Sequence, residues 1–322
     1  MSFIQTERFF DLYIGESFCD VSKLNGRKGL TPAPLEWSED LKDIRARCAK
    51  VRESVGQDEF SLVYDDRTFR VTTMVDVRGE TIYVLAIADE QKRRFADLGY
   101  PRPLCDALLA PDLTGLVLFG GPFGAGKTTS AAALAIARME QLGELIYAAE
   151  DPEETNLNGP HGPGRCLQVP IRRDGLDLEE QLARGVRSRA DAIYIGEIRR
   201  PSEAYQAVQS GVNGELIIAT AHGASLSDLI ERTAALASAK QSSANGLLAA
   251  GLAIVIFQQL EVVPLQEKGE TAAFLRSDFL FVNKSESDSV RAKIRAGRFG
   301  DLEQEIELQR NRVLWSNDTP RA

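Results

Sequence analysis

Residues 121–128 read GPFGAGKT and fill every fixed position of the phosphate-binding P-loop pattern. The motif directly follows an apolar run, GLVLF at 115–119, and precedes an Ala-rich stretch at 129–142 that Gly143 can close as a helix C-cap. A strand, a glycine-rich loop and a helix in this order predict an α/β fold with an anion site at the helix N-terminus. A glycine-rich turn without a ligand is the alternative, and the complete motif in its strand–helix context disfavours it.

Each residue type of the motif has a chemical role. Glycines leave backbone N–H groups free to surround phosphates, Lys127 can neutralise charge on the β- and γ-phosphates, and Thr128 can offer its hydroxyl to Mg²⁺. The sequence therefore predicts a bound nucleotide with Mg²⁺. The predicted nucleotide-binding residues of the loop are Gly121, Pro122, Phe123, Gly124, Ala125, Gly126, Lys127, Thr128 and Thr129.

Composition excludes several other classes of protein. With 322 residues and 43% hydrophobic content the chain is long enough for two domains, and a net charge of −9 argues against a broadly basic nucleic-acid-binding surface. The four cysteines form no CxxC pair, so neither a zinc knuckle nor a disulfide framework is predicted, and a reducing compartment fits best. The first residues lack the basic and apolar regions of a secretion signal, so we expect a cytoplasmic protein.

The first hundred residues differ in pattern from the rest. Three β-rich runs separated by turn sequences predict an antiparallel meander at 60–64, 68–75 and 81–87. A helix is predicted before it at 38–54, where a Ser cap and early acids precede apolar residues at helical spacing. We therefore predict a small α+β domain over residues 1–98, followed by a proline-containing linker over 99–113.

A second domain is predicted over residues 114–322, where short apolar runs alternate with helical stretches and indicate a mainly parallel sheet covered by helices. The predicted strands are 115–119, 144–149, 166–171, 192–198 and 215–221. Beyond Ser225 the pattern predicts mostly helices, including a buried core helix through the apolar run at 247–257. That run is too short to span a bilayer, which takes roughly 20 residues.

Carboxylates at predicted strand ends are candidates for a hydrolytic site. Glu150 and Asp151 follow one predicted strand, and Glu197 lies inside another, AIYIGEIR. Hydrolysis of a nucleoside triphosphate needs a group for Mg²⁺, one for the attacking water and a sensor of the γ-phosphate, and ligands of open α/β sheets bind where the parallel strands end. A solvated charge is the alternative for Glu197, although an acid closing an apolar strand is costly without a partner. The Glu150-Asp151 pair, followed by proline, also fits an ordinary turn.

His222 and a group of five arginines each allow a structural and a functional interpretation. His222 ends a predicted strand at the same sheet edge and is either structural or functional, whereas His161, in a loop rich in glycine and proline, is predicted to be exposed. Five arginines fit either a solvated helix face or arginine fingers that stabilise transition-state charge. They are Arg172, Arg173, Arg184, Arg187 and Arg189.

With these positions in hand, the chain resembles the secretion ATPase superfamily, the motors of type II and type IV secretion and of type IV pili. GPFGAGKTT at 121–129 resembles the family's Walker A motif, and AAEDPEE at 148–154 resembles its Asp box. IYIGEIRR at 193–200 is similar to its Glu-type Walker B motif, and TAH at 220–222 is similar to its His box. The four motifs stand in the family's order.

The resemblance continues outside the four motifs. FSLVYDDRTFRV at 60–71 is similar to a strand pair of the family's PAS-like N-terminal domain, and VIFQQL at 255–260 resembles its buried VxxQxL helix. VRAKIRAGR at 290–298 resembles the RNLIREGK element of pilus-retraction ATPases. The chain lacks the tetracysteine insertion of pilus-extension and type II secretion ATPases, so it is most similar to the pilus-retraction and type IV secretion branch.

The resemblance implies a RecA-like P-loop ATPase core with a smaller, PAS-like α+β N-terminal domain. It implies that Lys127 and Thr128 hold phosphate and Mg²⁺ and that Glu150 positions the lytic water. It also implies that Glu197 helps to hold Mg²⁺ and its waters and that His222 senses the nucleotide state. Which glutamate is the base stays open.

Three arginines match family positions near the nucleotide. Arg70 matches an arginine of the N-terminal domain that approaches nucleotide in relatives, and Arg173 and Arg187 match arginines near phosphate. Two departures leave the assignment of the arginine fingers open. Residues 168–171 read QVPI where the family often has QREV, and Arg200 stands where an Asp is usual.

The function implied by the resemblance is Mg²⁺-dependent ATP hydrolysis by a homo-hexamer at the cytoplasmic face of the inner membrane. Such a motor would act with a platform protein of a pilus or secretion machine, without direct nucleic-acid binding. Pilus dynamics, conjugation and effector secretion stay open, as does the direction of force. The alternative is a nucleotide-binding ring protein with a regulatory or assembly role and weak turnover; a nucleic-acid motor is disfavoured by the acidic balance.

Overall fold

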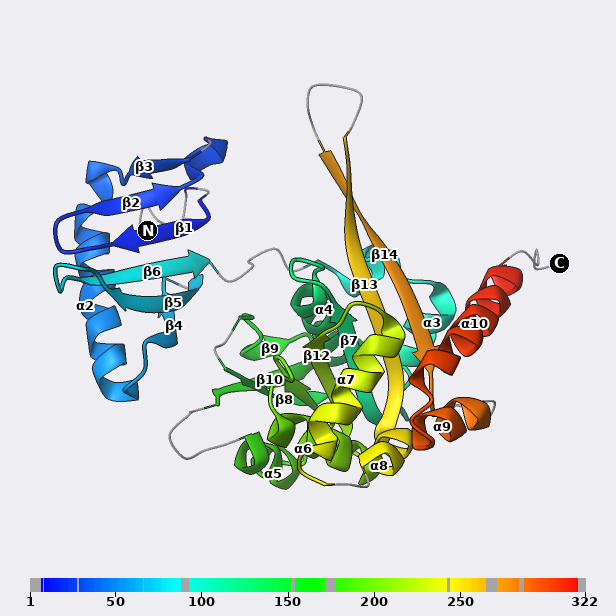
Figure 1. Ribbon diagram of the computed structural model, residues 1–322. Helices are drawn as coiled ribbons and strands as arrows, with labels where there is room; N and C mark the ends of the chain where they lie inside the picture. Colours follow the sequence, from blue (N-terminus) through cyan, green and yellow to red (C-terminus); the bar gives the residue numbers. More distant parts are fainter. Residues whose placement is uncertain are drawn as a thin grey trace. The chain divides into compact units, whose positions relative to one another are not determined.

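The computed structural model describes residues 7, 9–27, 29–65, 67–87, 93–151, 154–171, 178–241, 244–264, 271–283 and 287–317 (Figure 1). Their contacts divide the chain into two compact units. The first comprises Met1–Gln91 with Glu150–Asn156, and the second comprises Lys92–Ala149 with Leu157–Ala322.

The first unit is an antiparallel sheet packed on one long helix. The strands have the order β3-β2-β1-β6-β5-β4, and every neighbouring pair is antiparallel. The predicted meander is confirmed as β4, β5 and β6, whereas the three short strands before it were not predicted. The bounds are β1 Asp11–Ile14, β2 Cys19–Ser22, β3 Leu30–Pro32, β4 Glu59–Tyr64, β5 Arg67–Val75 and β6 Thr81–Ile87.

The helix of this unit, α2 (Ser38–Val55), lies where the sequence predicts it, but the predicted Ser cap is wrong, because Ser38 is the first helical residue and the N-cap is Trp37, without a side-chain hydrogen bond. Glu39 and Asp40 occupy its first turn, where carboxylates interact favourably with the helix dipole, and Gly56 ends it in the left-handed conformation with a φ of 70°. Its apolar side, including Ile44, packs with Trp37 and with residues of the sheet in one buried cluster. Two short 3₁₀ segments, η1 (Leu24–Gly26) and η2 (Leu35–Trp37), precede it.

The second unit is built on a mixed sheet with the order β14-β13-β7-β12-β11-β8-β10-β9. Its centre is parallel, because β13, β12, β11 and β8 join β7 through parallel pairs, whereas β14 pairs antiparallel with β13 and β9 pairs antiparallel with β10. The β13–β14 hairpin extends past the other strands (Figure 1). The bounds are β7 Gly115–Gly121, β8 Leu145–Glu150, β9 Gly159–His161, β10 Gly164–Pro170, β11 Ala192–Ile195, β12 Leu216–His222, β13 Leu252–Pro264 and β14 Thr271–Phe281.

Helices cover both faces of this sheet. Strand β7 is buried along its whole length, and its residues alternate between two clusters: Leu116 and Leu118 pack with α5 to α9, while Val117 and Phe119 pack with η3, α3 and α4. A strand buried on both faces explains the unbroken apolar run in the sequence. The bounds are η3 Phe95–Asp97, α3 Arg102–Leu108, α4 Lys127–Leu142, α5 Leu178–Arg187, α6 Pro201–Val212, α7 Leu226–Ser238, α8 Ala244–Gly251, α9 Asp288–Arg295, η5 Phe299–Asp301 and α10 Leu302–Asn317.

The helix predicted through 247–257 is confirmed only as far as residue 251, and from there through the VIFQQL motif the prediction is wrong. Helix α8 ends at Gly251, and strand β13 begins at Leu252. A Cβ atom on Gly251 would lie 2.5 Å from the Val208 carbonyl oxygen, so the backbone of α8 passes directly over α6 at this point. The run that follows is buried on both faces, and burial on both faces erases the periodicity that separates a strand from a helix. Among the described residues, no helix combines the length and apolar character needed to cross a bilayer.

Two helical glycines should respond to alanine in opposite directions. A Cβ on Gly211 would lie 2.6 Å from the Gly251 carbonyl oxygen and 3.0 Å from the Leu116 nitrogen, so Gly211→Ala forces backbone apart and should lower the free energy of unfolding by about 1–3 kcal/mol. A Cβ on Gly246 of α8 would meet nothing within 4 Å. Gly246→Ala should raise stability by about 0.5–1 kcal/mol through helix propensity. Urea unfolding measures both, and equal effects would contradict the packing described.

Candidate nucleotide site

The loop between β7 and α4 has the backbone of an anion cradle. Gly121, Gly124 and Gly126 have φ values of 152°, 74° and 80°, conformations that side chains disfavour. A Cβ on Gly121 would lie 2.2 Å from the Gln258 carbonyl oxygen. Gly126 is the N-cap of α4 and provides no side-chain cap, and the first turn holds no acidic residue. The N-terminus of α4 therefore suits a phosphate.

Lys127 is held inside this loop. The residue is only 7% exposed, and its Nζ donates hydrogen bonds to the carbonyl oxygens of Gly121 at 3.1 Å and Pro122 at 3.0 Å. The same Nζ lies 3.2 Å from Nδ1 of His222. These contacts supply the partners that a nearly buried ammonium group requires.

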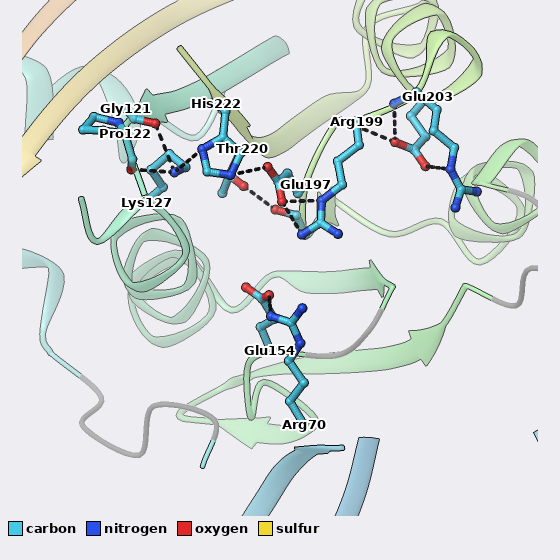
Figure 2. Close-up of polar contacts among 12 residues, drawn as sticks. Arg70, Gly121, Pro122, Lys127, Glu154, Glu197, Arg199, Glu203, Thr220 and His222 are labelled. Carbon is cyan, nitrogen blue, oxygen red and sulfur yellow. Dashed lines mark hydrogen bonds and ion pairs between the residues drawn. The ribbon is translucent and has the colours of Figure 1, made fainter. Parts of the chain in front are cut away.

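His222 reaches Lys127 because of the strand register. β12 pairs with β7 so that His222 lies opposite Gly121, the last residue before the loop. On its other side, the Nε2 atom of His222 lies 3.0 Å from Oε1 of Glu197 (Figure 2). His222 therefore joins the P-loop lysine to a carboxylate of the neighbouring strand connection.

Glu197 stands two residues beyond the end of β11, not inside the strand as predicted. Strand β11 ends at Ile195, and the Gly196 carbonyl that follows accepts a hydrogen bond of 2.5 Å from Thr220 Oγ1 of β12. Oε2 of Glu197 lies 2.5 Å from the Nε atom of Arg199. The backbone N–H groups of Gly196 and Ile198 still bond to the neighbouring strands, at the carbonyl oxygens of Ala149 and Thr220, and this holds Glu197 beside His222.

The polar side chains thus form one line, Lys127–His222–Glu197–Arg199, across the carboxyl ends of β7, β12 and β11 (Figure 2). Glu203 of α6 fixes the far end, because its Oε2 accepts hydrogen bonds from the backbone N–H groups at 199 and 200, at 2.7 and 2.9 Å. The last three residues of the line also border an open pocket of about 420 Å³, which α7 lines on one side. Sequence reasoning missed Arg199 as a partner of Glu197, although a cation two residues from a candidate acid is a usable signal.

Glu150 is the last residue of β8 and is 1% exposed. Its Oε2 accepts a hydrogen bond of 2.7 Å from Thr155 Oγ1, within the first unit. In the same unit, Arg70 of β5 pairs with Glu154 at 2.8 Å (Figure 2). The acid at 150 is thus a buried, hydrogen-bonded group.

The remaining predicted positions fall in different places. Arg187 is exposed at the end of α5, and Arg173 lies outside the described residues. The prediction that His161 is exposed is wrong: the residue is 8% exposed in β9, and its Nε2 lies 2.7 Å from the Leu157 carbonyl oxygen. A short hairpin of β9 and β10 folds the glycine- and proline-rich segment back against α4.

A P-loop on a parallel sheet, with a histidine and a glutamate at the same strand ends, defines a nucleotide-binding α/β protein. A family profile described as Type II/IV secretion system protein matches residues 56–315, and the chain belongs to this family. The resemblance drawn from the four motifs is therefore confirmed.

Curated relatives match about half of the chain. The type IV pilus assembly ATPase PilB of Pseudomonas aeruginosa is 32% identical over 170 residues, which cover 51% of this chain and 28% of that protein. From the same organism, the type II secretion system protein HxcR is 36% identical over 48% of this chain and 32% of its own length. The type IV pilus retraction ATPase PilT, also from this organism, is 32% identical over 45% of this chain and 42% of its own length. The matched segments span less than half of each of these relatives.

Solved structures share the fold over nearly the whole chain. The crystal structure of the pilus retraction motor PilT with bound ADP superposes with a TM-score of 0.71 at 20% identity, covering 93% of this chain and 86% of that one. The X-ray structure of the ATPase DotB of Legionella pneumophila superposes with a TM-score of 0.70 at 15% identity. This match covers 92% of this chain and 84% of DotB. The predicted RecA-like core with an antiparallel N-terminal sheet is confirmed.

The line of polar contacts predicts one tautomer for His222. An ammonium group only donates hydrogen bonds, so Nδ1 facing Lys127 must accept, and the ring proton lies on Nε2 toward Glu197. The chain holds two histidines, so long-range ¹H–¹⁵N spectra at neutral pH resolve both. Lys127→Met should shift the ¹⁵N signals of His222 and leave those of His161 unchanged. A proton on Nδ1 of His222 in the native protein would contradict this geometry.

Proposed function

We propose that the chain hydrolyses ATP with Mg²⁺ at the P-loop and that it does so as the motor subunit of a pilus or secretion machine. The observation that carries the proposal is the contact line from Lys127 through His222 to Glu197, which brings a phosphate-binding cation, a candidate sensor and an acid together at one edge of the sheet. The family and its ATPase relatives support it.

The residues of the loop fit a nucleotide with its metal ion. The glycine backbone and the N-terminus of α4 would bind phosphate oxygens, and Thr128 and Glu197 would hold Mg²⁺. The metal ion, when bound, neutralises charge that develops on the β- and γ-phosphate oxygens. Lys127 would exchange the carbonyl oxygens of Gly121 and Pro122 for phosphate oxygens.

The change of partners at Lys127 would affect Glu197 through His222. A lysine that turns to phosphate leaves Nδ1 of His222, and the imidazole is then free to reorient and to move its Nε2 relative to Glu197. We propose this as the sensing step. Glu197 or the buried Glu150 would orient the attacking water and accept its proton, and Arg70, Arg173 and Arg187 stay the candidates for stabilising phosphate charge.

The proposed assembly is a homo-hexamer at the cytoplasmic face of the inner membrane, working with a membrane platform protein and without direct nucleic-acid contact. The support is the family to which the chain belongs. Sedimentation of the purified chain with and without ATP and Mg²⁺ tests the first part. A monomer at micromolar concentration under both conditions would contradict the ring.

Hydrolysis by matched variants tests the catalytic assignment. Glu197→Gln keeps size and hydrogen-bonding capacity but removes the charge, and it should lower kcat by about 10²-fold or more while ATP still binds. Lys127→Ala should weaken ATP binding itself. Glu307→Gln, the same change at an exposed position of α10, should leave both properties unchanged.

Two outcomes would overturn this assignment. Equal rates in the native protein and Glu197→Gln would remove Glu197 from catalysis. ATP binding without measurable turnover in the native protein would favour the alternative, a nucleotide-binding ring protein with a regulatory or assembly role.

A further inference from the structure

A single glutamine side chain is buried beneath the P-loop. Gln258 of β13 is 0% exposed, and its Nε2 donates a hydrogen bond of 2.7 Å to the carbonyl oxygen of Ala125. Its Oε1 accepts a hydrogen bond of 2.6 Å from the hydroxyl of Tyr100. Both ends of the amide are therefore used, one on the P-loop and one on the segment before α3.

The bond to Ala125 fixes a peptide plane in the middle of the loop. A trans peptide places its C=O and N–H antiparallel, so holding the carbonyl of Ala125 toward β13 directs the N–H of Gly126 to the opposite face of the loop. In an anion cradle, successive N–H groups face the ligand, and a carbonyl on that face repels phosphate. The hydrogen bond from Gln258 satisfies the carbonyl of Ala125 on the face of the loop that is turned away from the proposed phosphate site.

Tyr100 decides which way the amide faces. The phenol is buried, and this burial raises the pKa of Tyr100 above its ordinary value, while a hydrogen bond from Ser130 acts in the opposite direction. The phenol therefore keeps its proton and donates it to Oε1, which leaves the NH₂ end of Gln258 for the loop. With the amide reversed, two oxygens would face each other at Ala125.

We propose that Tyr100 and Gln258 are positioning residues that hold the P-loop in its phosphate-binding shape through the carbonyl of Ala125. The proposal rests on the function proposed for the loop. The two hydrogen bonds of the Gln258 amide go to Tyr100 and to the carbonyl of Ala125, so we infer that it acts through the loop backbone and not on the reacting atoms.

Adjacent glutamines on β13 give a matched test in the full-length chain. Gln258→Met keeps the length of the side chain and removes both hydrogen bonds, and Gln259→Met makes the same change at the exposed neighbouring position. Tyr100→Phe removes only the hydroxyl and is the milder variant should Gln258→Met fail to fold. Hydrogen–deuterium exchange of peptides covering residues 121–130 in the nucleotide-free proteins measures how well the loop amides are protected, and it does not depend on ATP binding.

We expect amide exchange in the loop to accelerate in Gln258→Met and Tyr100→Phe and to stay native in Gln259→Met. The Kd for a fluorescent ATP analogue with Mg²⁺ should rise about tenfold in Gln258→Met, equivalent to about 1.4 kcal/mol. The kcat at saturating ATP should change less than threefold, because the groups proposed for hydrolysis are untouched. A merely structural loss would lower the folded fraction and kcat but leave the Kd of the folded protein unchanged.

The double variant completes the test. If the phenol acts only through the amide, Tyr100→Phe combined with Gln258→Met binds the analogue within twofold of Gln258→Met alone. Native loop exchange in both single variants, or multiplication of their effects on Kd, would overturn the proposal. Absence of nucleotide binding by the native protein would instead overturn the proposed function, and the exchange data would still decide whether the pair holds the loop.

Discussion

The pairing of β7 with β12 on one side and β13 on the other is the constraint on which the site depends. Gly121 lies opposite His222 in the first pair, and Gly120 lies opposite Phe257 in the second. A slip of one residue in either register would turn the side chains to the other face of the sheet. Gly121 would then lie opposite Ala221 or Gly223 instead of His222. Burial of β7 on both faces makes such a slip costly.

The strand pairing also determines the electrostatic surroundings of Lys127. A nearly buried ammonium group without phosphate needs other partners, and the loop supplies two of its own carbonyl oxygens together with an imidazole nitrogen. In the function proposed above, phosphate binding would therefore be an exchange of partners for Lys127. The same exchange would change its contact with His222 on the neighbouring strand.

The parts of the structure that local chemistry dictates were predictable. The P-loop is a fixed pattern of glycines before a lysine, and α2 carries early acids, apolar residues at helical spacing and a terminal glycine, so both could be predicted from short segments. The partners of Lys127 depend on pairings between distant strands, and β13 is hidden because an apolar strand buried on both faces has no period. His161 was misjudged since burial of a polar loop depends on what folds over it.

Two adjacent glutamines, Gln258 and Gln259, follow the apolar run, and their sequence does not show which of the two is buried and hydrogen-bonded. Its partners, Tyr100 and Ala125, lie more than a hundred residues earlier in the chain. No spacing rule connects such positions. Arg199 is a milder case, because its partner Glu197 is close in sequence and only the turn after β11 was unknown.

Strand β13 does not stop where it meets the P-loop. It continues from Gln258 to Pro264, a rise of roughly 20 Å at about 3.3 Å per residue, and pairs with β14 along this length (Figure 1). The base of this hairpin is tied to the P-loop twice, because Phe257 pairs opposite Gly120 of β7 and Gln258 donates its hydrogen bond to the Ala125 carbonyl. One continuous strand therefore connects the outer end of the hairpin to the backbone of the P-loop.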